Sequence, residues 1–436
     1  MPAKGDAAPG TAAPGGAVRP AGSTRLNIDD AFTMVSVRDP PIPIPQMQGS
    51  GFENRVSVNG VTEWTLSASM AAHVSDRLDL EEQQYAGGAA HTLSRNDFRE
   101  GYVAWQSAAS LYAELGRINV KSGSALGFNP TDFFKTRTQI DTASADPSAI
   151  RNDRLGTVMA RLQYLWAHGS LGAAAAPKLT APTPLSSTSP SGIDPLFDRT
   201  NSADRVLLTA NYDLADLSPQ ALVYRESGTT RFGLNISRTV GRSVVAFAEW
   251  AGGEQASLSA RAVAYGEETR SLPPGAPILP TGNAAEHFRN DLALGASWSG
   301  AHNLTVNFEY HYHQSGWSRQ DWQQGFALGQ AEPATAGALL WYVREFARDR
   351  QEPTSRQQFF VRVNCTDAII KNLELSAFEF VDAYDGSLYT QLSGAYYWSN
   401  HWTITAFATG TAGPPRSEYG SLPQARSATL ELVRYF

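Results

Sequence analysis

From about Phe52 to Phe436 the chain repeats a single pattern, in which segments of about 10–14 residues alternate apolar and polar side chains between turns or polar loops. Successive side chains of a β-strand point to opposite faces, so each segment predicts a strand with one apolar and one polar face. The segment 304–313 is the clearest example. Its apolar face holds Leu304, Val306, Phe308, Tyr310 and Tyr312, and its polar face holds Thr305, Asn307, Glu309, His311 and His313.

A soluble β-sandwich shows the same alternation, but its strands are usually about 5–6 residues long. The longer segments of this chain match the length that a tilted strand needs to cross a bilayer. Aromatic side chains such as Tyr164, Trp166 and Trp298 gather at segment ends, as expected at membrane interfaces. Charged residues make up only 18% of the chain, and no uninterrupted apolar run is long enough for a helical span. We therefore predict an all-β fold, an antiparallel up-and-down transmembrane β-barrel.

Turn signals set the number of strands. Seven short turns alternate with eight more variable connections. The short turns lie near 107–110, 168–170, 214–218, 240–242, 299–302, 366–371 and 399–401. This gives about 16 strands, or 18 if a further hairpin lies within 71–93 or 253–288. The short turns are expected in the periplasm and the long loops outside the cell.

One long loop, 314–354, carries apolar residues at helical spacing, namely Leu339, Leu340, Val343 and Phe346. This spacing predicts that the loop contains one short amphipathic helix. The helix would either cap or plug the barrel mouth, or simply pack on the surface of the loops.

Three regions are expected along the chain. Residues 1–25 are rich in Ala, Pro and Gly without periodicity, so we expect a disordered tail. Residues 26–51 include the proline-rich stretch 39–45, which cannot form a central strand, so we expect an extended segment in the periplasm or the barrel mouth. Residues 52–436 would form the barrel. The start of the chain lacks the basic region and apolar core of a secretory signal, so we expect the export signal to have been removed.

Composition and motifs argue against several function classes. A net charge of −7 without a run of Lys or Arg argues against a nucleic-acid partner. The single cysteine, Cys365, excludes an internal disulfide framework and a multi-cysteine metal site. No nucleophile elbow, zinc-protease motif, phosphate loop or dinucleotide fingerprint is present, so we predict a protein that is not an enzyme and uses no cofactor. A barrel hydrolase built from scattered Ser, His and Asp residues ranks third among the alternatives.

The polar faces carry charges that would line a water-filled lumen. Guanidinium groups facing carboxylates across a pore create a transverse field that favours small polar or charged solutes, although such pairs can also simply brace the wall. The pore-lining candidates are Arg117, Lys121, Arg161, Arg205, Arg231, Glu309, Arg362 and Glu374.

Glu309, His311 and His313 lie on one face of their predicted strand. Carboxylate and imidazole groups are metal ligands, but residues two apart on a strand are about 6–7 Å apart, which suits a single ion poorly. We therefore predict no metal site and expect these side chains to hydrate the lumen.

The segment 123–155 is long, rich in turn residues and placed after the third predicted strand. Charges there would have little effect if they faced only bulk solvent, so we predict that the segment folds into the barrel as a constriction whose basic residues help to set selectivity. An ordinary exposed loop is the alternative. The residues concerned are Asn129, Asp132, Lys135, Arg137, Asp141, Asp146, Arg151 and Arg154.

The C-terminus resembles the last strand of bacterial outer-membrane proteins, which the barrel-assembly machinery recognises. The matching positions are Ala428, Leu430, Leu432 and Phe436. Arg434 departs from the pattern, because an aromatic or apolar residue is usual there. The resemblance implies that Phe436 acts as an assembly signal and that the assembly machinery is a partner.

A second stretch, 115–134, resembles the Gly-Arg strand and the following Asn-Pro-x-Asp loop of outer-membrane porins and exporters, with alginate-export barrels as a distant relative. It contains Gly116, Arg117, Asn129, Pro130 and Asp132. The resemblance implies a channel in the Gram-negative outer membrane, in contact with lipid and lipopolysaccharide, that passes small hydrophilic solutes or an exported polymer. The main alternative is a structural sheath or anchor, its lumen filled by its own tail or by a periplasmic partner bound through residues 1–50.

Overall fold

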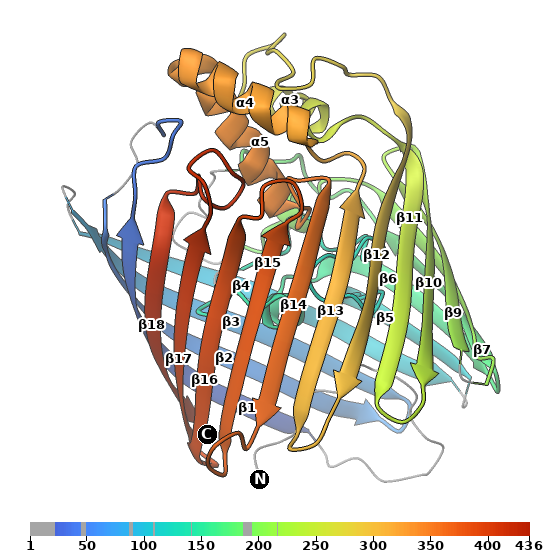
Figure 1. Cartoon of the computed structure of the whole chain (residues 1–436). Coiled ribbons are helices and arrows are strands. Elements are labelled where there is room, and N and C mark those ends of the chain that lie inside the picture. The colour runs from blue at the N-terminus through green and yellow to red at the C-terminus, as the bar shows by residue number, and fades with distance from the viewer. Residues whose placement is uncertain are drawn as a thin grey trace.

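The computed structural model describes residues 22–44, 49–86, 90–107, 110–140, 142–185, 194–215 and 217–436. Their 18 strands form one antiparallel sheet in which each strand pairs with its neighbours in sequence. The first strand, β1 (Ser23–Val37), also pairs with the last, β18 (Gln424–Tyr435). The sheet therefore closes into a barrel and leaves no free edge, as Figure 1 shows.

The other strands follow one another around the barrel. They are β2 (Gly51–Ser67), β3 (Met70–Tyr85), β4 (His91–Ser107), β5 (Leu111–Ile118), β6 (Thr157–Trp166), β7 (Gly169–Ala176), β8 (Arg205–Tyr212), β9 (Leu217–Glu226), β10 (Thr229–Val240), β11 (Val244–Gln255), β12 (His287–Ser299), β13 (Leu304–His313), β14 (Gln357–Thr366), β15 (Leu373–Asp382), β16 (Leu388–Ser399) and β17 (Trp402–Ala412). The helices of the described residues lie in the connections. They are α1 (Pro147–Asp153), α2 (Phe197–Thr200), α3 (Leu258–Glu268), α4 (Arg319–Ala331), the π-helix η1 (Pro333–Gly337) and α5 (Ala338–Asp349).

The prediction of about 16 strands is wrong, and the alternative of 18 strands is confirmed. One additional strand is β3, which lies within the segment 71–93. This segment has the composition of a loop, because Asp76 and Glu82 place charges on the outer face while Arg77 and Asp79 place them on the inner face. Charges on both faces hide the alternation that marks the other strands.

The second additional strand, β1, corrects the predicted N-terminal regions. It begins at Ser23, within the tail expected to be disordered, and continues through the first half of the segment 26–51, which was expected outside the wall. Ile28 and Phe32 give β1 an exposed apolar face like that of the other strands, although Asp29 and Asp30 interrupt the pattern. The barrel therefore starts at β1 and not at residue 52, and residues 1–21 lie outside the described part of the chain.

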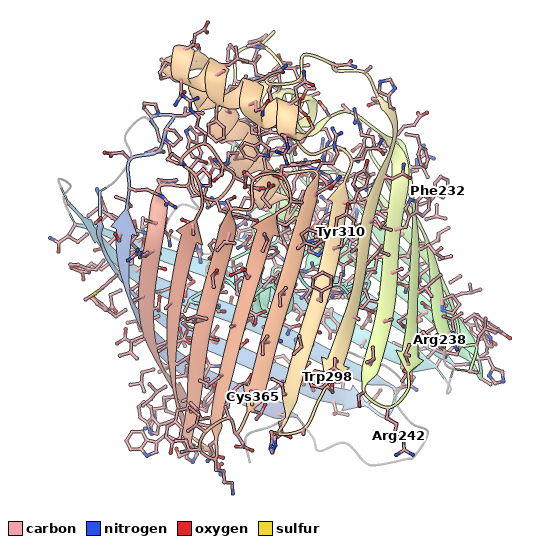
Figure 2. The ribbon with its side chains drawn as sticks, viewed as in Figure 1. Phe232, Arg238, Arg242, Trp298, Tyr310 and Cys365 are labelled. Atoms are coloured by element: carbon pink, nitrogen blue, oxygen red, sulfur yellow. The ribbon has the colours of Figure 1, made fainter. Side chains whose placement is uncertain are left out.

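Side-chain exposure confirms that apolar residues cover the outside of the barrel. On β13, Phe308 is 50% exposed, whereas the neighbouring Glu309 is completely buried. Phe232 and Trp298 are likewise exposed, and Figure 2 shows where they and Tyr310 lie on the wall. The predicted division into an outer apolar face and an inner polar face is therefore confirmed for these strands.

The two ends of the barrel differ. Short turns such as 241–243 and 300–303 lie at the end where the chain terminates, and the connections that carry α3, α4 and α5 lie at the opposite end (Figure 1). We call the second end the long-loop end. In outer-membrane barrels, long loops are extracellular and short turns are periplasmic.

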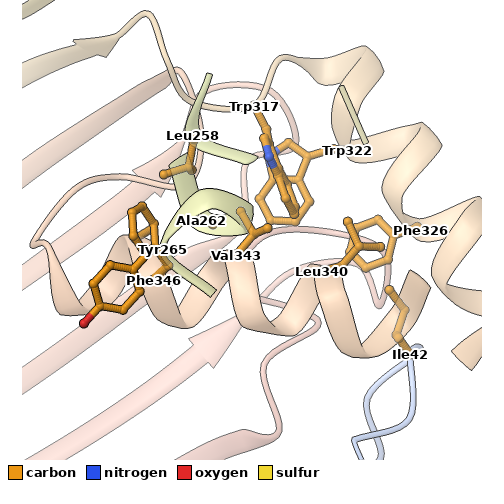
Figure 3. Close-up of a cluster of buried hydrophobic side chains, with 11 residues drawn as sticks. Ile42, Leu258, Ala262, Tyr265, Trp317, Trp322, Phe326, Leu340, Val343 and Phe346 are labelled. Carbon is orange, nitrogen blue, oxygen red and sulfur yellow. The ribbon is translucent and has the colours of Figure 1, made fainter. Parts of the chain in front are cut away.

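Three helices pack together at the long-loop end. Val343 and Phe346 of α5 are buried in one apolar cluster with Leu258 of α3 and Trp322 of α4, as Figure 3 shows. Ile42, from the connection between β1 and β2, completes the cluster. We call α3, α4, α5 and Ile42 the cap. The predicted amphipathic helix is confirmed by α5, whereas α3 and α4 are not predicted from the sequence.

None of the helices in the described ranges is long and apolar enough to span a membrane.

Candidate functional site

The connection between β5 and β6, residues 119–156, lies against the inner face of the wall, and we call it the inward loop. Glu249 of β11 accepts hydrogen bonds from the backbone N–H groups of residues 124 and 125, the second at 2.6 Å. Glu309 of β13 accepts hydrogen bonds from the N–H groups of residues 126 and 127, at 2.7 and 3.0 Å. Two buried carboxylates of the wall thus hold four consecutive backbone donors of the loop.

A buried ion pair within the inward loop fixes its fold. Asp132 accepts hydrogen bonds from both terminal nitrogens of Arg154, at 2.9 and 3.0 Å, and Arg151 Nε lies 3.5 Å from the same carboxylate. Lys135 donates from Nζ to the Asn129 carbonyl at 2.6 Å. The structure therefore brings these five predicted residues together, and their polar groups mainly contact one another.

Two further predicted residues of the inward loop connect it to other parts of the molecule. Asp146 accepts a hydrogen bond of 2.9 Å from Arg362 of β14 and also caps α1 through the N–H of Ser148. Arg137 Nε lies 3.2 Å from the carboxylate of Asp349, at the end of α5. The inward loop thus contacts both the wall and the cap. Residue 141 lies outside the described residues.

The predicted pore-lining residues all have polar partners, and they are spread around the wall instead of forming one site. Arg117 and Arg205 are only 2% exposed, so their side chains brace the wall. Whether the group lines a conducting path stays a prediction. The partners are the Gly156 carbonyl for Arg117, Asn152 for Lys121, Glu114 for Arg161, Glu226 for Arg205, Asp291 for Arg231, the Leu126 N–H for Glu309, Asp146 for Arg362 and Asn364 for Glu374, at distances between 2.6 and 3.1 Å.

The inner face of β3 and β4 carries a row of alternating charges that the sequence-based prediction does not include. Arg77 and Arg95 contact the carboxylate of Asp79 at 2.7 and 3.1 Å, and Arg95 also contacts Asp97 at 2.9 Å. Arg99 continues the row two residues further along β4. We call these five residues the charged ladder. The period-two spacing of Arg95, Asp97 and Arg99 is the sequence signal that identifies it, once β3 is recognised as a strand.

The inward loop reaches the charged ladder through α1. Asp153, at the end of this helix, lies 3.3 Å from the guanidinium of Arg99, and its side chain is 46% exposed. The inward loop therefore presents an accessible carboxylate beside the cations of the ladder.

The two histidines of β13 are buried beneath the inward loop. His311 lies 2.8 Å from Glu309, and His313 lies 2.8 Å from Asp291. The ring of Phe128 packs edge-on against both imidazoles. Each histidine is 1% exposed, so the expectation that they hydrate the lumen is wrong, because the loop covers them. Among the described residues, no cluster of three or more His, Cys, Asp or Glu side chains is arranged to hold a metal ion.

A cavity of about 520 Å³ lies between the inward loop and the cap. Its lining includes Phe133 and Lys135 of the inward loop, Tyr224 of β9 and Arg261 of α3. Burial lowers the pKa of Lys135 to about 8, although the nearby carboxylates of Glu352 and other residues favour its charged form. The cavity is thus enclosed by the wall, the inward loop and the cap together.

The C-terminal residue closes the barrel at the end with short turns. Phe436 donates its backbone N–H to the Leu26 carbonyl at 3.0 Å and leaves its side chain 59% exposed. The guanidinium of Arg434 lies 5.0 Å from the centre of the Phe436 ring. The role of Phe436 as an assembly signal stays a prediction, as does the binding of a partner through residues 1–50.

No protein-family model matches this chain, and no curated protein sequence matches it. Solved structures of outer-membrane proteins are similar to it in fold. OccAB1 of Acinetobacter baumannii aligns with a TM-score of 0.53 at 10% identity, covering 95% of this chain and 96% of that one. OccK11 (OpdR) of Pseudomonas aeruginosa aligns with a TM-score of 0.51 at 8% identity, with the same coverage of both chains. The chain therefore has the fold of a porin-type bacterial outer-membrane β-barrel.

Proposed function

We propose that the protein is an outer-membrane channel that passes small hydrophilic solutes through a polar lumen narrowed by the inward loop. The observation that carries the proposal is the anchoring of this loop to the inner wall by Glu249 and Glu309. A loop held across the lumen favours small solutes over an exported polymer. Location in the Gram-negative outer membrane is part of the same proposal, and the porin-type fold supports it.

The narrow part of the path would run beside α1 and the charged ladder, past the contact of Asp153 with Arg99. Asp153 supplies a carboxylate on the loop side, and Arg99 and Arg95 supply guanidinium groups on the wall side. Opposed charges across a pore orient water and polar solutes, which is how outer-membrane channels combine passage with selectivity.

Two arginines of the inward loop, Arg137 and Arg154, are less suited to selecting ions than the sequence suggests. Arg154 is 1% exposed and bound to Asp132, and Arg137 is 4% exposed and bound to Asp349. We therefore propose that these arginines hold the loop in place and that Arg95 of the charged ladder, whose side chain is 23% exposed, sets ion preference.

Ion selectivity in planar bilayers tests this assignment. Arg95→Gln should shift permeability toward cations by up to about fivefold, because a unit charge about 4 Å from an ion in water contributes about 1 kcal/mol. The matched control is Arg225→Gln, since Arg225 is exposed on the outer face of β9. Equal selectivity of the two variants would contradict the role of the ladder, and a folded wild type that passes no ions would instead favour the filled sheath.

The buried lysine predicts a pH dependence. Below pH 8 Lys135 carries a positive charge, and above pH 8 it loses that charge, because its pKa is lowered to about 8. Anion preference should therefore fall between pH 7 and 9 in bilayer recordings, and Lys135→Met should remove this step. Lys178→Met, which replaces an exposed lysine at the rim of the cavity, should retain it. A step unchanged by Lys135→Met would assign it to another group.

A further inference from the structure

The cavity between the inward loop and the cap combines charge balance with aromatic surface. Seven Lys or Arg side chains and seven Asp or Glu side chains line it, so its lining carries no formal net charge. Phe133 and Tyr224 also line it, with their rings stacked at a centroid distance of 4.6 Å, and Tyr265 of α3 adds a third aromatic ring. Its volume of about 520 Å³ falls within the range of pockets that enclose small ligands.

Three ion pairs join six of the fourteen charged residues of the lining, while Glu254, Glu268, Glu286 and Lys178 are exposed to solvent. Arg205 contacts Glu226 at 3.1 Å, and Arg231 contacts Asp291 at 2.6 Å. From the cap, Arg261 binds Glu352 through two hydrogen bonds of 3.2 and 2.8 Å. An ion entering the cavity would lose its hydration and would have to compete with these internal partners. A net charge on the solute therefore adds little to its free energy of binding.

A hydroxyl group meets different conditions in the same cavity. A guanidinium group has five N–H donors and a carboxylate has about four acceptor positions, so each ion pair keeps hydrogen-bonding capacity beyond the bonds that join its two members. A hydroxyl both donates and accepts, so it can bond to either member of a pair without separating them.

We propose that this cavity binds a small, uncharged, polyhydroxylated solute of the size of a mono- or disaccharide. The inference rests on the proposed channel function and names its solute class. The cavity is lined both by the inward loop and by α3, and α3 lies at the long-loop end (Figure 1), so a solute entering from that end would meet the cavity before the charged ladder.

Three solutes with the same ring and different charges test the proposal: glucose, glucuronate and glucosamine. Each is added to wild-type channels in a planar bilayer bathed in KCl, and the concentration that halves the current is measured. We expect glucose to act at a concentration about tenfold lower than the two charged solutes, because a charged solute would have to compete with the ion pairs inside the cavity. Equal or tighter block by glucuronate or glucosamine would overturn the solute class, and conduction without block by any of the three would overturn the site. A folded barrel without conductance would overturn the channel function itself.

A variant that unbalances the cavity gives a second test. Glu226→Gln leaves Arg205 without its carboxylate, so the ratio of glucuronate to glucose affinity should rise about tenfold over the wild type. Glu345→Gln is the control, because Glu345 of α5 is a carboxylate outside the lining of the cavity. A similar change in both variants, or no change in Glu226→Gln, would contradict the proposed balance of charge.

Discussion

Replacing Asp132 by Ala is expected to release the inward loop from its fixed conformation. Arg154 would keep its buried position without its only carboxylate partner at hydrogen-bonding distance, and breaking a buried ion pair in this way costs about 3–5 kcal/mol. Single-channel recordings should then show a larger and noisier open-channel current than the wild type, because the loop no longer occupies one position.

The double variant Asp132→Leu with Arg154→Met is the matched control. Exchanging both members of a buried pair for apolar side chains of similar volume is often neutral, so the loop should stay in place and the current should remain quiet. If the single and double variants gave the same noise, the ion pair would not be what holds the loop.

Replacing Phe308 by Arg should prevent most of the protein from folding into the membrane. Phe308 is 50% exposed on the outer face of β13, and an arginine facing lipid near the middle of the bilayer costs about 2–4 kcal/mol. Asn307→Arg, one residue earlier on the inner face, should lower the free energy of unfolding much less. Urea titrations of both variants in lipid vesicles measure this difference, and equal losses of stability would contradict the assignment of the two faces.

The sequence predicts the wall of the barrel well, because an alternating pattern is a local property of each strand. Strand β13 is the clearest case, with Phe308 outside and Glu309 inside. The pattern fails for β1 and β3, where Asp30 and Asp76 interrupt the outer apolar face. A strand with charges on both faces cannot be distinguished from a polar loop by periodicity alone.

The length and the turn residues of the loop after β5 suggest that it folds into the barrel. They do not predict which residues of the wall it contacts. Glu249 binds a residue 124 positions earlier in the chain, and Arg362 binds Asp146 across 216 positions. Pairings over such separations depend on the closed barrel, so the sequence identifies these charges without identifying their partners. For the same reason His311 and His313 look like lumen residues in the sequence, although the loop buries them.

The most direct test of the account is the conductance of the purified barrel in a planar bilayer, with and without the inward loop. Residues 122–152 can be replaced by a short Gly-Ser linker, because Ile118 of β5 pairs with Thr157 of β6, which keeps the two ends of the inward loop adjacent. The wild type should conduct ions, and the loop-deleted barrel should conduct severalfold more. Equal conductance of the two proteins, or a folded wild type that does not conduct, would contradict the proposed function.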